Sequence, residues 1–113
     1  MSDPVLVRFA ELMRDQYRAD IYLFGSRSRG KHHVGSDYDL VAVSPSFAGQ
    51  RRMLRALDRF DLWEQAGGRQ LSLDLHCYTP EEFAEELDSL GYLGEADERG
   101  ELLKVSVAAK DAA

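Results

Sequence analysis

Two spacings of hydrophobic residues alternate along the chain and predict both helices and strands. From Pro4 onward, apolar residues recur every three or four positions, as on an amphipathic helix of about three turns. Shorter runs are either apolar throughout or alternate strictly with polar residues, which is typical of strands. The predicted strands cover residues 21–24, 38–43 and 71–77, and an edge strand is predicted at 101–107.

The segment between the second and third strands carries a helical pattern and a row of arginines. Met53, Leu57 and Phe60 fall on one stripe, and they predict a helix over residues 48–66 whose apolar side is buried. Arginines recur every four residues, at 51, 55 and 59. We interpret this row as a solvent-exposed helix face, and the alternative is a docking face for an acidic partner or for RNA.

A further helix is predicted to begin after the third strand. Thr79 suits the cap position and Pro80 the first turn, and Glu81 and Glu82 place acids at the positive end of the helix. The helix is expected to end just before Gly91, with its glutamates on a solvent-exposed face. The next two residues, Tyr92 and Leu93, are expected to pack onto the core.

The third strand carries an acidic residue in its middle. In the run from Leu71 to Cys77 the leucines face one side, and Asp74 shares the other side with Ser72 and His76. Aspartate is disfavoured inside a strand, so Asp74 requires a reason such as an exposed face or a bound cation. We interpret His76 as a surface or half-buried residue.

A glycine turn follows the first strand and has the features of a phosphate site. Gly25 permits backbone conformations that are closed to most residues and lets other groups approach the main chain. Ser26 is a good cap for a helix, whose first N–H groups would suit a phosphate. Arg27 and Arg29 could add charge-assisted hydrogen bonds.

Two carboxylates lie at the start of the second strand. Asp37 and Asp39 are two residues apart, so in a strand both leave the same face. Such a pair repels unless a cation lies between its members, and oxygen ligands beside a phosphate site favour Mg²⁺. If the second and third strands are neighbours, Asp74 completes a cluster of three carboxylates.

The turn and the acidic pair together resemble the DNA polymerase β-like nucleotidyltransferases, and among them the minimal nucleotidyltransferases. The family pattern is Gly-Ser, ten residues and Asp-x-Asp, and here Gly25-Ser26 is followed by residues 27–36 and Asp37-Tyr38-Asp39. The family carries its third acid on a later strand, where this chain has Asp74. Tyr38 replaces the aliphatic residue that is more common in the family, and we expect it to point away from the acids.

The resemblance implies a fold and a reaction. The fold would be the polymerase β-like α+β fold, one domain over residues 1–113 with a small mixed β-sheet and helices packed on one face. Asp37, Asp39 and Asp74 would be catalytic and would hold two Mg²⁺ ions. The reaction would move NMP, in the first place AMP from ATP, to a hydroxyl group and release pyrophosphate. The residues expected to bind the nucleotide are Gly25, Ser26, Arg27, Arg29 and Ser36.

The same resemblance implies a protein partner. Minimal nucleotidyltransferases are often antitoxins of HEPN-family RNase toxins, which they silence by adding AMP to a toxin tyrosine, and this role is our leading hypothesis. One alternative is a non-catalytic antitoxin that blocks its toxin by contact alone. Another is transfer to a small molecule or an RNA end, which has less weight because no helical acceptor-binding domain follows the predicted sheet. The sequence leaves open whether the chain forms homo-oligomers.

Composition limits the remaining possibilities. The chain has 113 residues with a net charge of −6, which argues against nucleic acid as a stable partner. Cys77 is the single cysteine, and with no signal peptide and no apolar run of membrane-spanning length it indicates a cytoplasmic protein. His32 and His33 lack partners at zinc spacing, so we interpret them as part of a solvent-exposed loop rather than as metal ligands.

Overall fold

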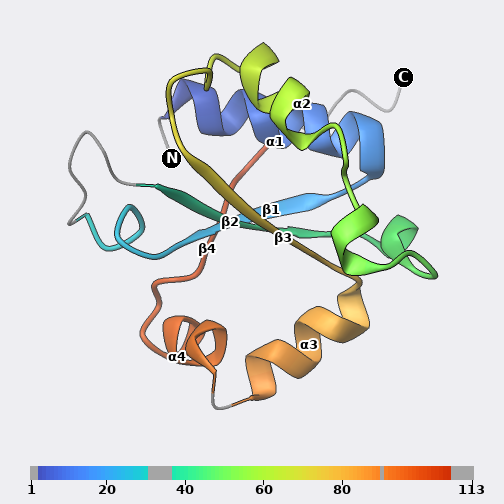
Figure 1. The fold of residues 1–113 in the computed structure, drawn as a ribbon. Coiled ribbons are helices and arrows are strands. Elements are labelled where there is room, and N and C mark those ends of the chain that lie inside the picture. Colours follow the sequence, from blue (N-terminus) through green and yellow to red (C-terminus); the bar gives the residue numbers. More distant parts are fainter. Residues whose placement is uncertain (1–2, 31–36, 90, 108–113) are drawn as a thin grey trace.

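The computed structural model describes residues 3–30, 37–89 and 91–107, and a four-stranded sheet lies at its centre (Figure 1). The strands are β1 (Asp20–Phe24), β2 (Tyr38–Val43), β3 (Leu73–Tyr78) and β4 (Leu103–Lys104), in the order β3-β2-β1-β4. β2 is parallel to β3, and β1 is antiparallel to both β2 and β4. The predicted mixed sheet is confirmed, although the strand expected over 101–107 is reduced to two residues.

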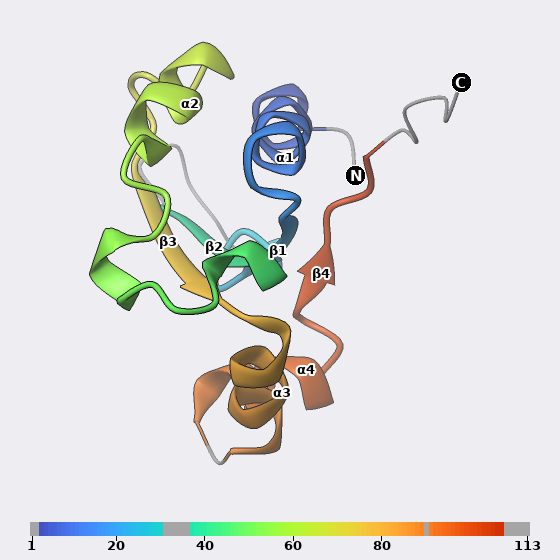
Figure 2. The same ribbon diagram turned by 90° about the vertical axis from the view of Figure 1, so that its right-hand side faces the viewer.

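Helix α1 (Pro4–Tyr17) covers one face of the sheet together with α2 (Arg59–Gln65) (Figure 2). The carboxylate of Asp3 caps α1 by accepting the N–H groups of Val5 and Leu6, both at 3.1 Å. The main core lies between these helices and the sheet, and each large side chain buried there contributes about 1.5–3 kcal/mol. Its fully buried members include Leu6, Phe9, Met13, Ile21, Leu40 and Phe47.

Helices α3 (Pro80–Asp88) and α4 (Tyr92–Glu98) lie on the opposite face (Figures 1 and 2). The helices therefore cover both faces of the sheet, whereas the sequence analysis had led us to expect them on one face only. The reason lies in β2, which is apolar on both sides: Leu40 packs toward α1, while Val41 packs with Phe83 of α3 and Leu93 of α4. In the part of the chain that the structure describes, none of the helices has the length and apolarity that a bilayer crossing requires.

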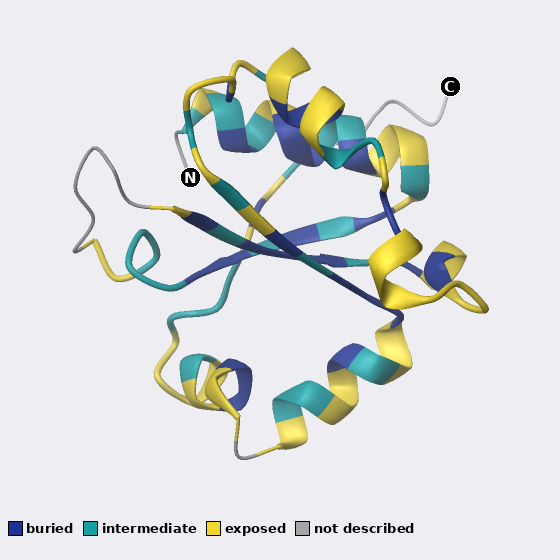
Figure 3. Ribbon diagram, in the orientation of Figure 1, coloured by how far each residue is buried: buried dark blue, intermediate teal, exposed yellow. Residues whose placement is uncertain are grey.

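The predicted helix over residues 48–66 is wrong in its first half. The chain forms two short 3₁₀ turns, η1 (Pro45–Phe47) and η2 (Arg52–Leu54), before α2 begins. Met53 is 80% exposed, and Leu57 and Phe60 are exposed as well, so the predicted apolar stripe is not buried (Figure 3). Ala56 has a positive φ of 49°, which a continuous helix does not allow.

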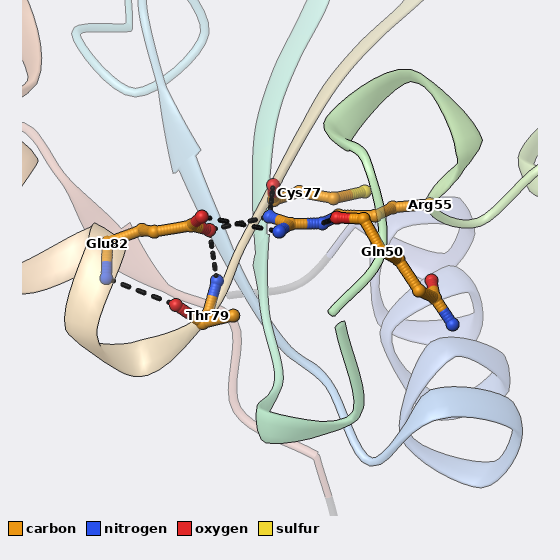
Figure 4. A network of polar contacts seen from close by, with 5 residues as sticks. All are labelled: Gln50, Arg55, Cys77, Thr79 and Glu82. Carbon is orange, nitrogen blue, oxygen red and sulfur yellow. Dashed lines mark hydrogen bonds and ion pairs between the residues drawn. The ribbon is translucent and has the colours of Figure 1, made fainter. Parts of the chain in front are cut away.

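Arginines attach this segment to the sheet in place of hydrophobic residues. Arg55 is 4% exposed, and its guanidinium donates hydrogen bonds to the carbonyl oxygens of Gln50 and Cys77 at 2.9 and 3.0 Å (Figure 4). It also pairs with Glu82 of α3 at 2.5 Å. Arg59 donates to the carbonyl oxygen of Leu75 at 2.8 Å. The interpretation of Arg55, Arg59 and Glu82 as solvent-exposed is therefore wrong. The two arginines supply donors to the outward carbonyls of the edge strand β3, and Glu82 accepts hydrogen bonds from Arg55.

Candidate active site

Two of the predicted acids lie side by side at one end of the sheet. The strand register pairs Phe24 of β1 with Asp39 of β2, and Asp39 with Asp74 of β3. Paired residues of adjacent strands project from the same face. Both carboxylates therefore leave the sheet on the side of α3 and α4, in a row that begins with the ring of Phe24.

The surroundings of Asp39 disfavour the charged form of its carboxylate. Burial raises the pKa of Asp39, and the negative charges of Asp74 and Asp37 raise it further. His76 and Arg29 act in the opposite direction. Asp37, an exposed residue directly before β2, is thus close enough to act on Asp39.

The residues of the acid row are of the type that a divalent cation such as Mg²⁺ takes as ligands. The repulsion at Asp39 is the kind that a bound cation relieves, and carboxylate oxygens are the ligands that Mg²⁺ prefers. Over residues 3–30, 37–89 and 91–107, no three Asp, Glu, His or Cys side chains are gathered closely enough to hold a metal ion. The acids lie next to one another at one end of the sheet, but their side chains do not converge on a common position.

Gly25 lies directly against Asp39. Its φ of +78° is in the left-handed region, and a Cβ atom at this position would lie 2.3 Å from Oδ2 of Asp39. The turn and the acidic strand therefore meet, and glycine is the residue that fits between them. Residues 26–30 form a hydrogen-bonded turn rather than the predicted helix start, with the N–H groups of Ser28 and Arg29 donating to the carbonyl oxygen of Gly25. Ser26 is half-buried at the beginning of this turn.

Arg29 and Asp39 share a pocket, which we call the glycine-turn pocket. Its volume is about 170 Å³, and Gly25, Arg29 and Asp39 line it together with Arg99 at the end of α4. Glutamates also line it, and Glu101 and Glu95 lie 4.0 Å from Arg29 and Arg99, respectively. The sequence analysis missed Arg99, because nothing in the local sequence indicates that α4 returns to the glycine turn.

Arg27 goes to the other side of the sheet. Its guanidinium lies 3.8 Å from the centre of the Tyr38 ring, in the core that faces α1. The Tyr38 hydroxyl donates to Asp3 at 2.6 Å, and burial together with this hydrogen bond raises the pKa of Tyr38 to about 12. Tyr38 therefore points away from the acids as expected, and the structure does not bring Arg27 to them.

His76 is half-buried on the same face as the acids, next to Asp74. Its Nε2 lies 3.4 Å from Oδ2 of Asp74 without forming a hydrogen bond. Nε2 is buried and has no hydrogen-bond partner among the described residues. Buried polar atoms are nearly always paired, so this nitrogen is a candidate ligand contact. Ser36, His32 and His33 lie outside the described residues.

A larger pocket lies elsewhere on the part of the chain that the structure describes. It has a volume of about 460 Å³, and Met53, Leu57 and Phe60 line it together with the outer edge of β3. None of Asp37, Asp39 and Asp74 belongs to it. We therefore place the candidate active site by its chemistry, at the glycine-turn pocket, and not by pocket size.

Comparison with known proteins concerns the fold and the family of the chain. Residues 6–110 match the family model of the nucleotidyltransferase domain. A protein of Sulfolobus solfataricus that is assigned as a nucleotidyltransferase is similar in structure, with a TM-score of 0.51, 19% identity, and coverage of 72% of this chain and 69% of that chain. A chain from the crystal structure of a toxin–antitoxin with AMP-PNP gives a TM-score of 0.52 and 22% identity, and covers 92% of this chain and 74% of that chain. Among curated proteins, no sequence matches this chain significantly.

Proposed function

The chain belongs to the nucleotidyltransferase-domain family, and from this premise we propose that it transfers a nucleoside monophosphate from an NTP to a hydroxyl group. One observation carries the proposal. Gly25 lies against Asp39 in the glycine-turn pocket, and Asp39 is paired with Asp74 on the neighbouring strand, so the predicted phosphate-binding turn and the paired carboxylates lie next to each other. Nucleotidyl transfer requires these two parts next to each other.

The acids have separate roles in this proposal. Asp37, Asp39 and Asp74 would hold Mg²⁺, which supplies positive charge to the phosphates when it is bound. Asp74 is the more exposed member of the Asp39–Asp74 pair, and we assign to it the orientation of the acceptor hydroxyl. Gly25, Ser26 and Arg29 would contact the β- and γ-phosphates, and Arg99 adds a second positive charge to the same pocket. Arg27 is left out of the proposed site because it stacks on Tyr38, and the predicted role of Ser36 stays a prediction.

The proposed reaction replaces one bond at the α-phosphorus of the NTP with another. The acceptor oxygen forms a bond to the α-phosphorus, and the bond from that phosphorus to the oxygen bridging to the β-phosphate breaks. Pyrophosphate leaves with the electron pair, and the hydroxyl proton passes to the carboxylate of Asp74 and then to water. The products are the acceptor carrying one NMP group and free pyrophosphate.

We further propose ATP as the donor and a tyrosine of a HEPN-family toxin as the acceptor. The support is the resemblance of the Gly-Ser and Asp-x-Asp motifs to the minimal nucleotidyltransferases, together with the similarity in fold to a chain of a toxin–antitoxin with AMP-PNP. In this role the protein is an antitoxin that acts by modification of its partner.

Asp39→Asn tests the proposal. In the presence of Mg²⁺, ATP and a co-purified HEPN-family toxin, mass spectrometry of the toxin should show added AMP with the parent and none with the variant. The variant should be as stable as the parent or more stable without Mg²⁺, because paired like charges on neighbouring strands cost about 0.2–1 kcal/mol. The control is Asp97→Asn, an exposed aspartate of α4 outside the pocket, which should transfer normally.

Two results would contradict the proposal. Transfer by Asp39→Asn at the parent rate would remove the carboxylates from the reaction. Full protection against the toxin by an Asp37→Asn/Asp39→Asn double variant would instead assign the protein to the non-catalytic antitoxins.

A further inference from the structure

A second pocket adjoins the glycine-turn pocket, and we call it the aromatic pocket. It lies on the face of the sheet that carries α3 and α4 and has a volume of about 160 Å³. Phe24, His76, Tyr78 and Tyr92 supply its rings, and Glu86 of α3 supplies a carboxylate. Phe24 and Tyr92 also line the glycine-turn pocket. The two pockets are therefore separated by a shared aromatic wall.

Tyr92 is the accessible part of this wall. It is 66% exposed at the first position of α4, whereas the next residue, Leu93, is buried and anchors the helix. The expectation that Tyr92 packs into the core is thus wrong. The Tyr92 ring lies 5.9 Å from that of Phe24, and the Phe24 ring lies 6.3 Å from that of His76. The three rings lie in a row beside Asp39, whose register partner is the buried Phe24.

We infer that the aromatic pocket binds the base of the nucleotide, with the exposed ring of Tyr92 as its stacking platform. The inference rests on the proposed function. A nucleotide has a polyanionic end and a flat aromatic end, and the two adjoining pockets match this division. Arg29 and Arg99, each 4.0 Å from a glutamate, line the first pocket, and aromatic rings line the second.

A polar group of the aromatic pocket is also available to the base. His76 lines this pocket, and its buried Nε2 lies 3.4 Å from Oδ2 of Asp74 but has no hydrogen-bond partner within the described residues. A base edge offers donors and acceptors that can satisfy such a nitrogen. The larger pocket beside Met53 and Phe60 shares His76 and Tyr78 with this one but does not reach Gly25. A nucleotide whose phosphates lie at Gly25 therefore places its base in the aromatic pocket.

Binding of two probes to Tyr92→Ala tests the inference. The probes are ATP and inorganic tripolyphosphate, each with Mg²⁺, and affinities are measured by isothermal titration calorimetry. Loss of a base-stacking ring weakens binding by about 5- to 150-fold, so ATP should bind Tyr92→Ala that much more weakly. Tripolyphosphate has no base and should bind equally to the parent and the variant. Tyr92→Phe keeps the ring and should restore ATP binding.

Phe60→Ala is the matched control, because it removes an exposed aromatic ring from the other pocket and should change neither affinity. Equal ATP affinity of the parent and Tyr92→Ala would overturn the inference. Equal weakening of ATP and tripolyphosphate would also overturn it, since Tyr92 would then shape the phosphate pocket and not hold a base. If the parent binds neither probe, the proposed function itself fails.

Discussion

Glu82→Gln removes one negative charge from the contact that joins α3 to the segment before α2. Glu82 accepts hydrogen bonds from Nη1 and Nη2 of the buried Arg55 at 2.5 and 3.2 Å (Figure 4). The same carboxylate accepts the N–H of Thr79 at 2.8 Å and closes the capping box of α3. A glutamine carbonyl can also close a capping box. The substitution therefore removes the charge and preserves the helix cap.

The pKa of Glu82 sets the size of the effect. The hydrogen bonds from Arg55 and from the Thr79 N–H lower the pKa of Glu82 from 4.5 to about 2. This lowering corresponds to at most about 3 kcal/mol of stability. The Glu82 side chain is 28% exposed, so solvent screening reduces the contribution to about 1–2 kcal/mol. The variant also leaves the Arg55 guanidinium buried without its counter-charge, and we expect a total loss of about 1–3 kcal/mol near pH 7.

Urea unfolding followed by the fluorescence of the buried Trp63 measures this loss, at about pH 7, 5 and 3. The folded-state pKa of Glu82 is below its unfolded value, so the ionised carboxylate stabilises the fold above about pH 4.5 and its contribution disappears as the pH falls toward 2. The difference between parent and Glu82→Gln should therefore shrink on acidification.

The exposed Glu85 of the same helix provides the control, because Glu85→Gln should change stability by less than about 0.5 kcal/mol. A Glu82→Gln variant as stable as the parent near pH 7 would refute the reasoning. A stability difference between parent and Glu82→Gln that stays constant down to about pH 3 would also refute it, because the difference would then not depend on the charge of Glu82.

Two further substitutions probe the turn and the exposed segment. Gly25→Ala should lose transfer and about 1–2 kcal/mol of stability, because its Cβ would meet Asp39 at a positive φ; Gly49→Ala, with a φ of +80° and nothing within 4 Å, should lose stability only. Thermal unfolding and the AMP-transfer assay separate the two, and an active Gly25→Ala would contradict the contact. Phe60→Ser should cost less than about 0.5 kcal/mol, whereas Phe47→Ala in the core should cost about 3–5 kcal/mol; urea unfolding that ranks them in the other order would contradict the exposure of Phe60.

The acid row was predictable because it depends on local rules. Side chains alternate along any strand, so Asp74 had to face away from the leucines of β3. The spacing from Gly25 to Asp39 follows from the sequence alone. What the spacing could not give is the register, in which Asp39 pairs with Asp74 and not with a neighbour two residues away.

The segment from 48 to 60 was mispredicted because its arginines and its hydrophobic residues exchange their usual places. A four-residue arginine spacing normally marks a solvent-exposed helix face. Here Arg55 and Arg59 turn inward, because the outer edge of β3 offers the carbonyls of Cys77 and Leu75. The carbonyl oxygens that accept hydrogen bonds from the two arginines belong to a strand that lies later in the sequence, so no pattern within residues 48–66 predicts these contacts.

The candidate site divides along the same line between local and long-range contributions. Gly25 and Asp39, which we propose to contact the phosphates and Mg²⁺, were both predicted from motif and spacing. The turn at 26–30 then sends Arg27 toward α1 and leaves Arg29 in the pocket, so two arginines that are equivalent in the sequence differ in the fold. The second arginine of the pocket, Arg99, and the exposed ring of Tyr92 lie at the two ends of α4. Only the packing of α4 across the end of β1 brings them close to Asp39. The residues proposed to contact the phosphates could therefore largely be predicted from the sequence, whereas the contacts proposed for the base depend on tertiary packing.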